Sequence, residues 1–194
     1  NTVKKALLIG INYTGTQGEL RGCINDTTNL KKFLLDNQYF KEDELVFMND
    51  EEKENLYPSK KNIENQLNEL VLFATENKTK NVEIFISYSG HGSQMTDTNN
   101  DEKDGIDEVL CPVDYDKAGF IKDDYLKKDI IDKLHEKVSC MVLIDACHSG
   151  TMIDLKYDYD IQRKLLLPNL VPSCKSDVVM ISGCRDDQTS ADAY

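Results

Sequence analysis

The fold of this chain is decided at residues 142–150, where the sequence reads Val-Leu-Ile-Asp-Ala-Cys-His-Ser-Gly. An apolar run ends there abruptly in small residues and a cysteine. Residues 84–92 show the same pattern as Ile-Phe-Ile-Ser-Tyr-Ser-Gly-His-Gly, with a histidine in place of the cysteine. Such runs are typical of strands buried in a parallel sheet. Because open α/β sheets form their ligand crevice at the carboxyl ends of the strands, we expect Cys147 and His91 at one site.

Strand and helix patterns alternate along the rest of the chain. The clearest helix follows Pro58, where apolar residues from Ile63 to Ala74 recur at helical spacing. Further helices are expected at 25–35 and 126–134, strands at 4–11, 45–48, 82–87, 138–144 and 178–182, short extended segments at 109–113 and 120–121, and a loop at 96–105. This alternation predicts an α/β fold with a mostly parallel central sheet flanked by helices.

Composition restricts the compartment and the class of partner. The chain has 194 residues, which suits one domain, and a net charge of −12. This charge argues against a nucleic-acid partner and is compatible with basic substrates or metal cations, although a solvated acidic surface also explains it. No apolar stretch approaches the roughly 20 residues of a membrane span, and the first residues form no signal peptide. The six cysteines contain no CxxC pair, which favours a reducing compartment. We expect a cytoplasmic monomer that contacts no membrane.

Both ends of the sequence carry an expectation about a longer protein. The sequence begins with Asn1 rather than Met, which indicates a trimmed N-terminus. It stops at Tyr194, directly after a polar loop that follows the last expected strand. Because a sheet of this kind usually continues, we expect either a fragment or a further segment.

A cysteine and a histidine at one sheet edge have a well-defined chemistry. A thiol attacks a carbonyl carbon as the thiolate, and a nearby imidazole generates the thiolate by taking the proton. Gly90 and Gly92 allow backbone to pass close to a substrate, and the amides of Gly92 and Cys147 are candidate donors to an oxyanion. Each side chain alone has an ordinary structural alternative, which is packing in the core for Cys147 and a structural contact for His91. Their paired placement favours catalysis.

The two motifs belong to a wider resemblance. A cysteine preceded by alanine, with a histidine about 50 residues upstream, is typical of caspase-type cysteine proteases. Together with residues 22–26 (Gly-Cys-Ile-Asn-Asp), 107–108 (Asp-Glu), 123–124 (Asp-Asp) and 182–193, the sequence resembles a type I metacaspase. The resemblance implies the caspase-hemoglobinase fold, a Cys147–His91 dyad and cleavage after Arg or Lys. It also implies one catalytic domain with a large-subunit region at 1–155, a linker at 156–176 and the start of a small-subunit region at 177–194. The sequence departs from the family at its ends, where a leader and most of the small subunit are absent.

Cleavage after a basic residue requires carboxylates in the pocket that binds it. The resemblance implies that this pocket is lined by Cys23, Asp26, Ser89 and Asp145. Independently of the family, Asp145 lies two residues before Cys147 and Ser89 lies two before His91, so strand alternation allows both to face one crevice. Asp26 has an alternative role near a helix start, as a cap or as a first-turn partner of the helix dipole.

Acidic residues are also candidates for a calcium site. Residues 97–108 span the length of an EF-hand loop, but Glu102 replaces the glycine at its sixth position and no helices flank it, so we reject the EF-hand. The resemblance instead implies a calcium site formed by Asp107, Asp123, Asp124 and Asp154. A solvated acidic loop is the alternative.

The leading hypothesis is a calcium-dependent cysteine endopeptidase that acts on peptide or protein substrates with Arg or Lys before the scissile bond. Self-cleavage is expected in the charged linker, with candidate sites at Lys156, Arg163 and Lys164. The alternative from another class is a catalytically idle caspase-fold module that binds calcium or protein partners. A caspase-type enzyme that cleaves after Asp would need a basic pocket, whereas the candidates here are acidic.

Overall fold

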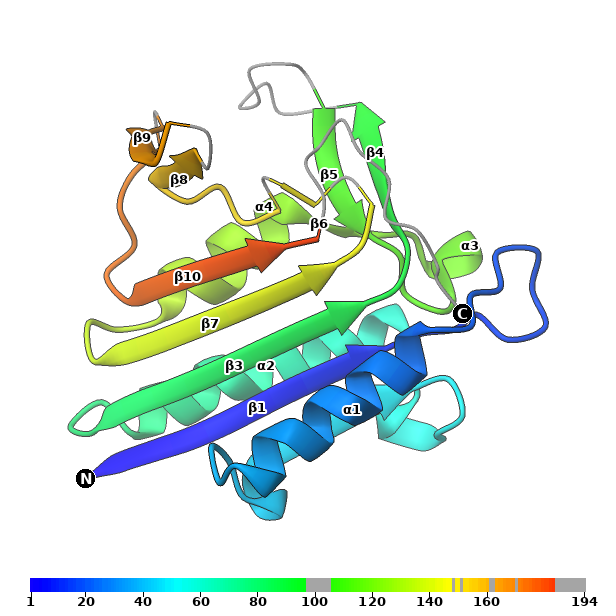
Figure 1. Ribbon diagram of the computed structural model, residues 1–194, viewed down its shortest axis with the longest axis horizontal. Helices are drawn as coiled ribbons and strands as arrows, with labels where there is room; N and C mark the ends of the chain where they lie inside the picture. Colours follow the sequence, from blue (N-terminus) through cyan, green and yellow to red (C-terminus); the bar gives the residue numbers. More distant parts are fainter. Residues whose placement is uncertain (97–105, 148, 151, 161–162, 170, 184–194) are drawn as a thin grey trace.

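Two neighbouring strands, β1 (Thr2–Gly10) and β3 (Asn81–Ser89), form the buried centre of the molecule because their apolar runs are covered on both faces. The computed structural model describes residues 1–96, 106–147, 149–150, 152–160, 163–169 and 171–183. Its central sheet is entirely parallel, in the order β10-β7-β3-β1-β2 (Figure 1). The other three strands are β2 (Leu45–Asn49), β7 (Val138–Asp145) and β10 (Asp177–Ser182). The predicted α/β class and parallel sheet are confirmed.

Helices cover the two faces of this sheet unequally. On one face, α2 (Lys60–Glu76) and the helical segment 123–133 share the larger cluster of buried side chains with the central strands. On the other face, α1 (Cys23–Asp36) packs on a smaller cluster that includes Leu8 and Phe85. Figure 1 shows α1 in front of the sheet and α2 behind it. Short helical turns complete the set: η1 (Glu42–Glu44), η2 (Glu54–Leu56) and α3 (Tyr115–Ala118). No helix in the described part of the chain combines the length and apolar content needed to cross a membrane.

The segment 123–133 lies close to the helix predicted at 126–134, but its geometry is not uniform. It is made of α4 (Asp123–Tyr125), a π-helical turn η3 (Leu126–Ile130) and a 3-10 turn η4 (Ile131–Lys133). Ile130 and Ile131 are adjacent in sequence, and each is only 1% exposed. A regular α-helix would direct them about 100° apart around its axis. The change from the π-helical to the 3-10 turn falls between these two buried residues.

Two smaller antiparallel sheets complete the fold. β4 (Gly92–Thr96), β5 (Ile106–Leu110) and β6 (Ile121–Lys122) form a three-stranded sheet beyond the carboxyl ends of β3 and β7 (Figure 1). β8 (Tyr157–Asp160) pairs with β9 (Leu165–Pro168), inside the stretch expected to be a linker. The sequence indicated extended segments near β5 and β6 but not β4, β8 or β9. Thr96 ends β4, and residues 97–105 of the expected loop lie outside the described residues.

The close approach of α1 to the end of β1 generates a stability prediction. A β-carbon at Gly10, the last residue of β1, would lie 2.6 Å from the Thr27 hydroxyl oxygen and 2.9 Å from the Cys23 carbonyl oxygen, both in α1. Gly10→Ala is therefore expected to push α1 outward and to lower the free energy of unfolding by about 1–3 kcal/mol. Urea denaturation measures this difference. The loss should be smaller in a Thr27→Ala background, measured against Thr27→Ala alone, because half of the collision is gone. A Gly10→Ala protein as stable as the parent would contradict the packing described here.

Candidate active site

The carboxyl ends of β3 and β7 place two side chains at the same level of the sheet. Ser89 and Asp145 are in-register partners at the last positions of these strands. His91 and Cys147 each follow two residues later, and both are half-buried. Gly92 lies against the Cys147 backbone so closely that a β-carbon there would collide with the Cys147 carbonyl oxygen. The segments that carry His91 and Cys147 are therefore in direct contact.

The imidazole of His91 is oriented by a backbone carbonyl from the loop between β1 and α1. Its Nε2 atom lies 2.6 Å from the carbonyl oxygen of Gly18. A carbonyl oxygen can only accept a hydrogen bond, so Nε2 carries the hydrogen and Nδ1 of the neutral ring is left to accept a proton. A β-carbon at Gly18 would lie 3.3 Å from Nε2, so a glycine suits this close approach. Sequence reasoning missed Gly18, because a carbonyl contact leaves no signal in residue type.

The other cysteines near the sheet are poor nucleophiles. Burial raises the pKa of Cys111 to about 12, and the charge of nearby Cys147 adds to the rise. Burial also raises the pKa of Cys140 to about 12, and it raises the pKa of Cys174. Among the described cysteines none is in a disulfide. Cys147 differs from Cys111 and Cys140 in being half-buried at a strand end rather than enclosed in the core.

Ser89 and Asp145 share one face of the sheet. The residues before them, Tyr88 and Ile144, are buried in the cluster on the α2 side. Because side chains alternate along a strand, Ser89 and Asp145 point to the α1 side. Ser89 is buried, whereas Asp145 is exposed, with its Oδ1 2.9 Å from the position of a β-carbon at Gly183. The Asp145 side chain is therefore at the surface, two residues before Cys147.

The other two expected pocket residues lie at the start of α1. Cys23 is buried, and its carbonyl oxygen lies close to Gly10, which pairs in register with Ser89. Asp26 is exposed in the first turn, and its backbone N–H donates to the Gly22 carbonyl. Since the N-cap of α1 is Gly22, Asp26 is not the cap, although it is placed to interact with the helix dipole. Cys23 is thus near Ser89 at the sheet edge. Asp26 lies three residues further along α1.

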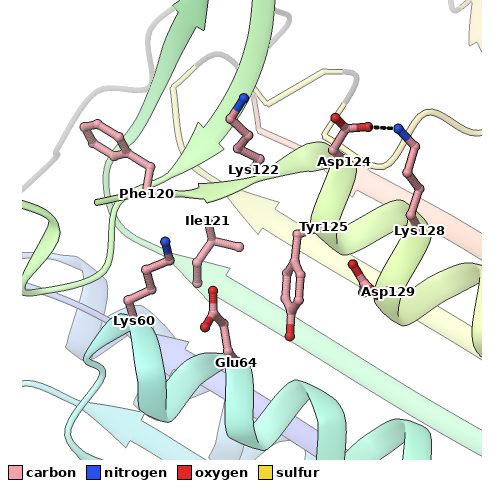
Figure 2. Close-up of a pocket in the computed structure, with 9 residues that line it drawn as sticks. All are labelled: Lys60, Glu64, Phe120, Ile121, Lys122, Asp124, Tyr125, Lys128 and Asp129. Carbon is pink, nitrogen blue, oxygen red and sulfur yellow. Dashed lines mark ion pairs between the residues drawn. The ribbon is translucent and has the colours of Figure 1, made fainter. Parts of the chain in front are cut away.

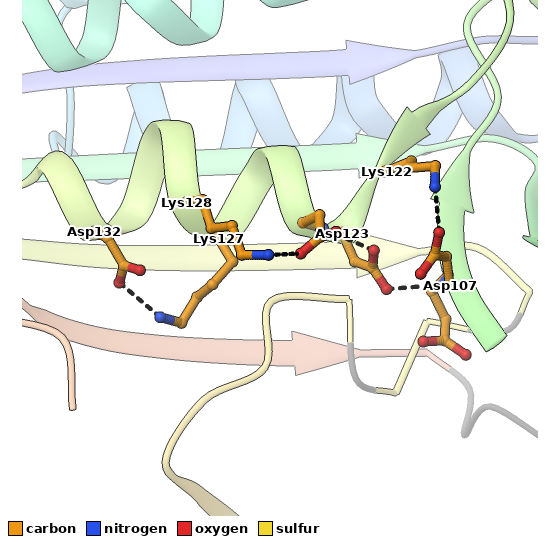
Figure 3. A network of polar contacts seen from close by, with 8 residues as sticks. Asp107, Lys122, Asp123, Lys127, Lys128 and Asp132 are labelled. Atoms are coloured by element: carbon orange, nitrogen blue, oxygen red, sulfur yellow. Dashed lines mark hydrogen bonds and ion pairs between the residues drawn. The ribbon is translucent and has the colours of Figure 1, made fainter. Parts of the chain in front are cut away.

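Buried carboxylates lie beside this edge, in β5 and at the start of α4 (Figure 3). Asp107 and Asp123 are each 1% exposed. The Asp123 carboxylate accepts the backbone N–H of Glu108 at 2.8 Å and that of Asp124 at 2.7 Å. One oxygen of Asp107 forms an ion pair with Lys122, while its buried Oδ1 finds no hydrogen-bond partner among the described residues. Burying a carboxylate oxygen without a hydrogen-bond partner costs free energy, so a positively charged or hydrogen-bonding partner at this atom would stabilise Asp107.

The acidic side chains perturb one another. Burial raises the pKa of Asp123 to about 7, its two backbone hydrogen bonds oppose the rise, and the carboxylates of Asp154 and Asp107 add to it. Asp124 instead forms an ion pair with Lys128 at 2.5 Å. Within the described ranges, no group of three or more acidic, histidine or cysteine side chains is already arranged to hold a metal ion. Asp107 and Asp154 are close enough to Asp123 for their charges to act on it, while Lys122 and Lys128 pair with Asp107 and Asp124.

Comparison with known proteins decides the family. The family model for the metacaspase, peptidase C14 domain matches residues 4–156. The chain belongs to the metacaspase family. This is a family of cysteine-type peptidases, which are hydrolases. The match ends directly before β8, so it includes both strand ends that carry His91 and Cys147.

Relatives of this metacaspase extend beyond the matched region. Metacaspase-1 of Sclerotinia sclerotiorum is 36% identical over 237 residues, covering 98% of this chain and 54% of the relative. Metacaspase-1B of Aspergillus terreus is 41% identical over 238 residues, covering 98% and 62%. The chain thus spans about half the length of the curated relatives it matches. A solved structure of a protein from Geobacter sulfurreducens has a TM-score of 0.65 at 24% identity, covering 98% of this chain and 76% of that one, which shows a shared fold.

A surface cavity of this metacaspase is lined by neither His91 nor Cys147. It has a volume of about 310 Å³ and is formed between the start of α2 and the segment 120–129 (Figure 2). Lys122, Asp124 and Lys128 line it, so it borders the acidic group, whereas neither His91 nor Cys147 does. The candidate active site is therefore the edge of the sheet that carries His91 and Cys147, not this cavity.

The perturbed thiols predict a selective labelling pattern. At pH 8 a thiol with a pKa of about 12 is ionised in only about one molecule in ten thousand, so Cys111 and Cys140 should react with iodoacetamide far more slowly than Cys147. Raising the pH from 8 to 10 should increase labelling of Cys111 on the order of a hundredfold, since the thiolate is the reactive form. Peptide mass spectrometry over time measures each site, with urea-unfolded protein as the control in which the differences vanish. Equal labelling of Cys111 and Cys147 in folded protein would refute this electrostatic description.

Proposed function

We propose that this chain is a calcium-activated cysteine endopeptidase that cleaves after Arg or Lys, with Cys147 as nucleophile and His91 as base. The observation that carries the proposal is the matched placement of the two residues. Each lies two positions beyond one of two in-register strand ends, and the Gly92 and Cys147 backbones are in contact. Membership of a cysteine peptidase family supports it.

Proton transfer between the dyad follows from the orientation of the imidazole. The Gly18 carbonyl holds the hydrogen on Nε2, so Nδ1 takes the thiol proton as Cys147 attacks the scissile carbonyl carbon. The same proton is then delivered to the leaving amine, and water hydrolyses the resulting thioester. The fixed ring avoids the wrong tautomer without needing a carboxylate as a third member.

The backbone of Gly92 is suited to stabilise the oxyanion that forms during attack. Cys111 N–H donates to the His91 carbonyl, so residues 91 and 111 form a hydrogen-bonded position of the β4–β5 ladder. The next pair, Gly92 and Leu110, is then a position that exchanges no ladder bonds, and the Gly92 N–H points away from β5. Because Gly92 touches the Cys147 backbone, this amide is available beside the nucleophile.

The preference for Arg or Lys is supported by acidic and polar groups at the same sheet edge. The exposed Asp145 carboxylate and the neighbouring Ser89 face the α1 side, where Cys23 and Asp26 begin α1. A hydrogen bond between charged partners contributes about 1.5–3 kcal/mol, enough to select a basic side chain.

Calcium activation is supported by the chemistry of the acidic group. Calcium prefers oxygen ligands and tolerates ligands gathered from several segments. Three segments supply carboxylates here: β5 with Asp107, α4 with Asp123 and Asp124, and the chain after β7 with Asp154. The buried, unsatisfied Oδ1 of Asp107 marks a position where a cation would be stabilised. The residues therefore fit calcium, provided that Lys122 and Lys128 release their partners. A bound calcium ion would supply positive charge that neutralises these carboxylates.

Self-cleavage and a cytoplasmic location complete the proposal. Arg163 and Lys164 lie exposed between β8 and β9, and Lys156 directly precedes β8. Basic residues in a short exposed hairpin are accessible to a protease of this specificity. The described cysteines are thiols, which is compatible with the reducing cytoplasm. We further propose that the enzyme acts as a monomer.

A peptide-library digestion tests the chemistry. Wild-type protein with calcium should cut after Arg and Lys, and both Cys147→Ala and His91→Ala should abolish cleavage because one member of the proton relay is missing. Asp145→Asn and Asp26→Asn should each lose about ten- to a hundredfold in kcat/KM on Arg substrates, the factor that corresponds to 1.5–3 kcal/mol. Mass spectrometry of the incubated protein should show cuts after Lys156, Arg163 or Lys164.

A peptide with an uncharged residue before the scissile bond is the control for this digestion. Its slow cleavage should not change in the two Asp variants. An active Cys147→Ala protein, or an unchanged preference for Arg in both Asp variants, would contradict the assigned roles.

Calorimetric titration tests the metal. Wild-type protein should bind calcium more tightly than magnesium, which requires a stricter octahedral geometry. Asp107→Asn and Asp154→Asn should weaken calcium binding on the order of tenfold or more, because each removes one negative charge. Lys122→Met should strengthen it, since the lysine no longer competes for Asp107.

Asp129→Asn is the matched control, because Asp129 is a nearby carboxylate that pairs with the exposed Lys133. This variant should bind calcium like the wild type. Full peptidase activity in chelator would contradict calcium activation. Unchanged calcium affinity in Asp107→Asn and Asp154→Asn would show that these carboxylates do not bind the ion.

A further inference from the structure

The β4–β5 ladder is interrupted at its first position, next to His91. The two strands pair from Gly92 opposite Leu110 to Thr96 opposite Ile106, so His91 lies opposite Cys111. The Cys111 N–H donates to the His91 carbonyl at 3.1 Å, as expected for a hydrogen-bonded pair. The reciprocal bond does not run directly: the His91 N–H donates to the Tyr13 hydroxyl at 2.9 Å, and that hydroxyl donates to the Cys111 carbonyl at 2.6 Å. The Tyr13 hydroxyl thus occupies the ladder as a bridging water molecule would.

A second buried hydroxyl supports this bridge. Tyr88 donates to the carbonyls of His91 at 2.8 Å and Cys111 at 2.9 Å, and its oxygen lies 3.0 Å from the Tyr13 oxygen. Burial raises the pKa of both tyrosines above the usual value, so both hydroxyls keep the protons that they donate. Each tyrosine is 1% exposed. A β-carbon at Gly90 would lie 2.9 Å from each hydroxyl oxygen, so the glycine leaves the space that they fill.

We propose that Tyr13 is a positioning residue for His91, which it holds away from β5 by keeping the ladder open. This inference rests on the proposed role of His91 as the base. Without the hydroxyl, the His91 N–H and the Cys111 carbonyl would satisfy each other directly, since buried polar groups seek partners. The ladder would then close by one residue and draw the His91 backbone toward β5. The imidazole would lose its 2.6 Å contact with the Gly18 carbonyl.

The aromatic ring of Tyr13 has a separate contact, which makes the test clean. Its centroid lies 4.6 Å from that of the His91 imidazole. Tyr13→Phe removes the hydroxyl and keeps this ring contact. The variant is expected to lower kcat at least tenfold while KM changes less than twofold, because the residues proposed to bind substrate are untouched. Alkylation of Cys147 by iodoacetamide at pH 7 should slow in parallel, since it reports on the same base without any substrate.

Two matched variants separate positioning from general destabilisation. Tyr88→Phe removes a hydroxyl that contacts the carbonyls of both residues but accepts no hydrogen bond from the His91 N–H, so the His91 N–H keeps its partner and kcat should fall much less. Tyr125→Phe removes a hydroxyl that accepts from the Asn68 amide away from the dyad, and its kinetics should match the wild type. A crystal structure of Tyr13→Phe should show the His91 nitrogen and the Cys111 oxygen within hydrogen-bond distance.

Three outcomes would overturn the inference. These are wild-type kcat and alkylation in Tyr13→Phe, an equal loss in Tyr88→Phe, and an unchanged distance between His91 and Cys111 in the crystal structure. If wild-type protein cleaves no peptide at all, the proposed function fails instead, and the alkylation rates and the crystal structure still test the spacer role of Tyr13.

Discussion

The parallel pairing of β3 with β7 is the constraint on which the rest of the site depends. Ser89 opposite Asp145 fixes where both strands end, and the next residues of each strand lead to His91 and Cys147 at the same offset. A slip of one residue would turn the buried side chains of a strand to its other face, so the core on the α2 side enforces this register. The spacing of His91 and Cys147 is thus set by apolar packing along the length of the two strands.

Strand order then decides which loop reaches the histidine. β1 lies next to β3, so the chain that leaves β1 passes beside the end of β3 and supplies Tyr13 and Gly18. One contacts the backbone of His91 and the other its ring. Both contacts use groups that remain protonated or neutral, so the arrangement of the imidazole does not depend on the charge of a third side chain. Both tyrosine side chains are buried, so these contacts are shielded from solvent.

Patterns within one segment were readable from the sequence, whereas contacts between segments were not. The runs that became β1, β3 and β7, and the helical spacing that became α2, carry their own apolar signature, and the short motifs after β3 and β7 correctly placed His91 and Cys147 at neighbouring strand ends. β4 reads Gly-Ser-Gln-Met-Thr and has no apolar run, so it is a strand only because β5 pairs with it. Gly18 and Tyr13 contact His91 from 73 and 78 residues earlier in the chain. Each contact involves a backbone group, and backbone groups are the same in every residue type. The pairing of Lys122 with Asp107 was missed for a similar reason, since it depends on how β6 aligns with β5.

The acidic group lies on segments that adjoin those of His91 and Cys147, since Asp107 is in β5, which pairs with β4, and Asp154 follows Cys147 in the chain. β4 continues directly from His91, and its five ladder pairs with β5 include Met95 opposite Asp107. The chain after Cys147 leads within seven residues to Asp154, whose charge acts on Asp123. Asp123 in turn holds the Glu108 backbone in β5. A change in the charge of these carboxylates would therefore act on the backbone of β5 through Asp123. It would also act on the chain that follows Cys147 through Asp154. Lys122 and Lys128, which pair with Asp107 and Asp124, belong to the same charge balance.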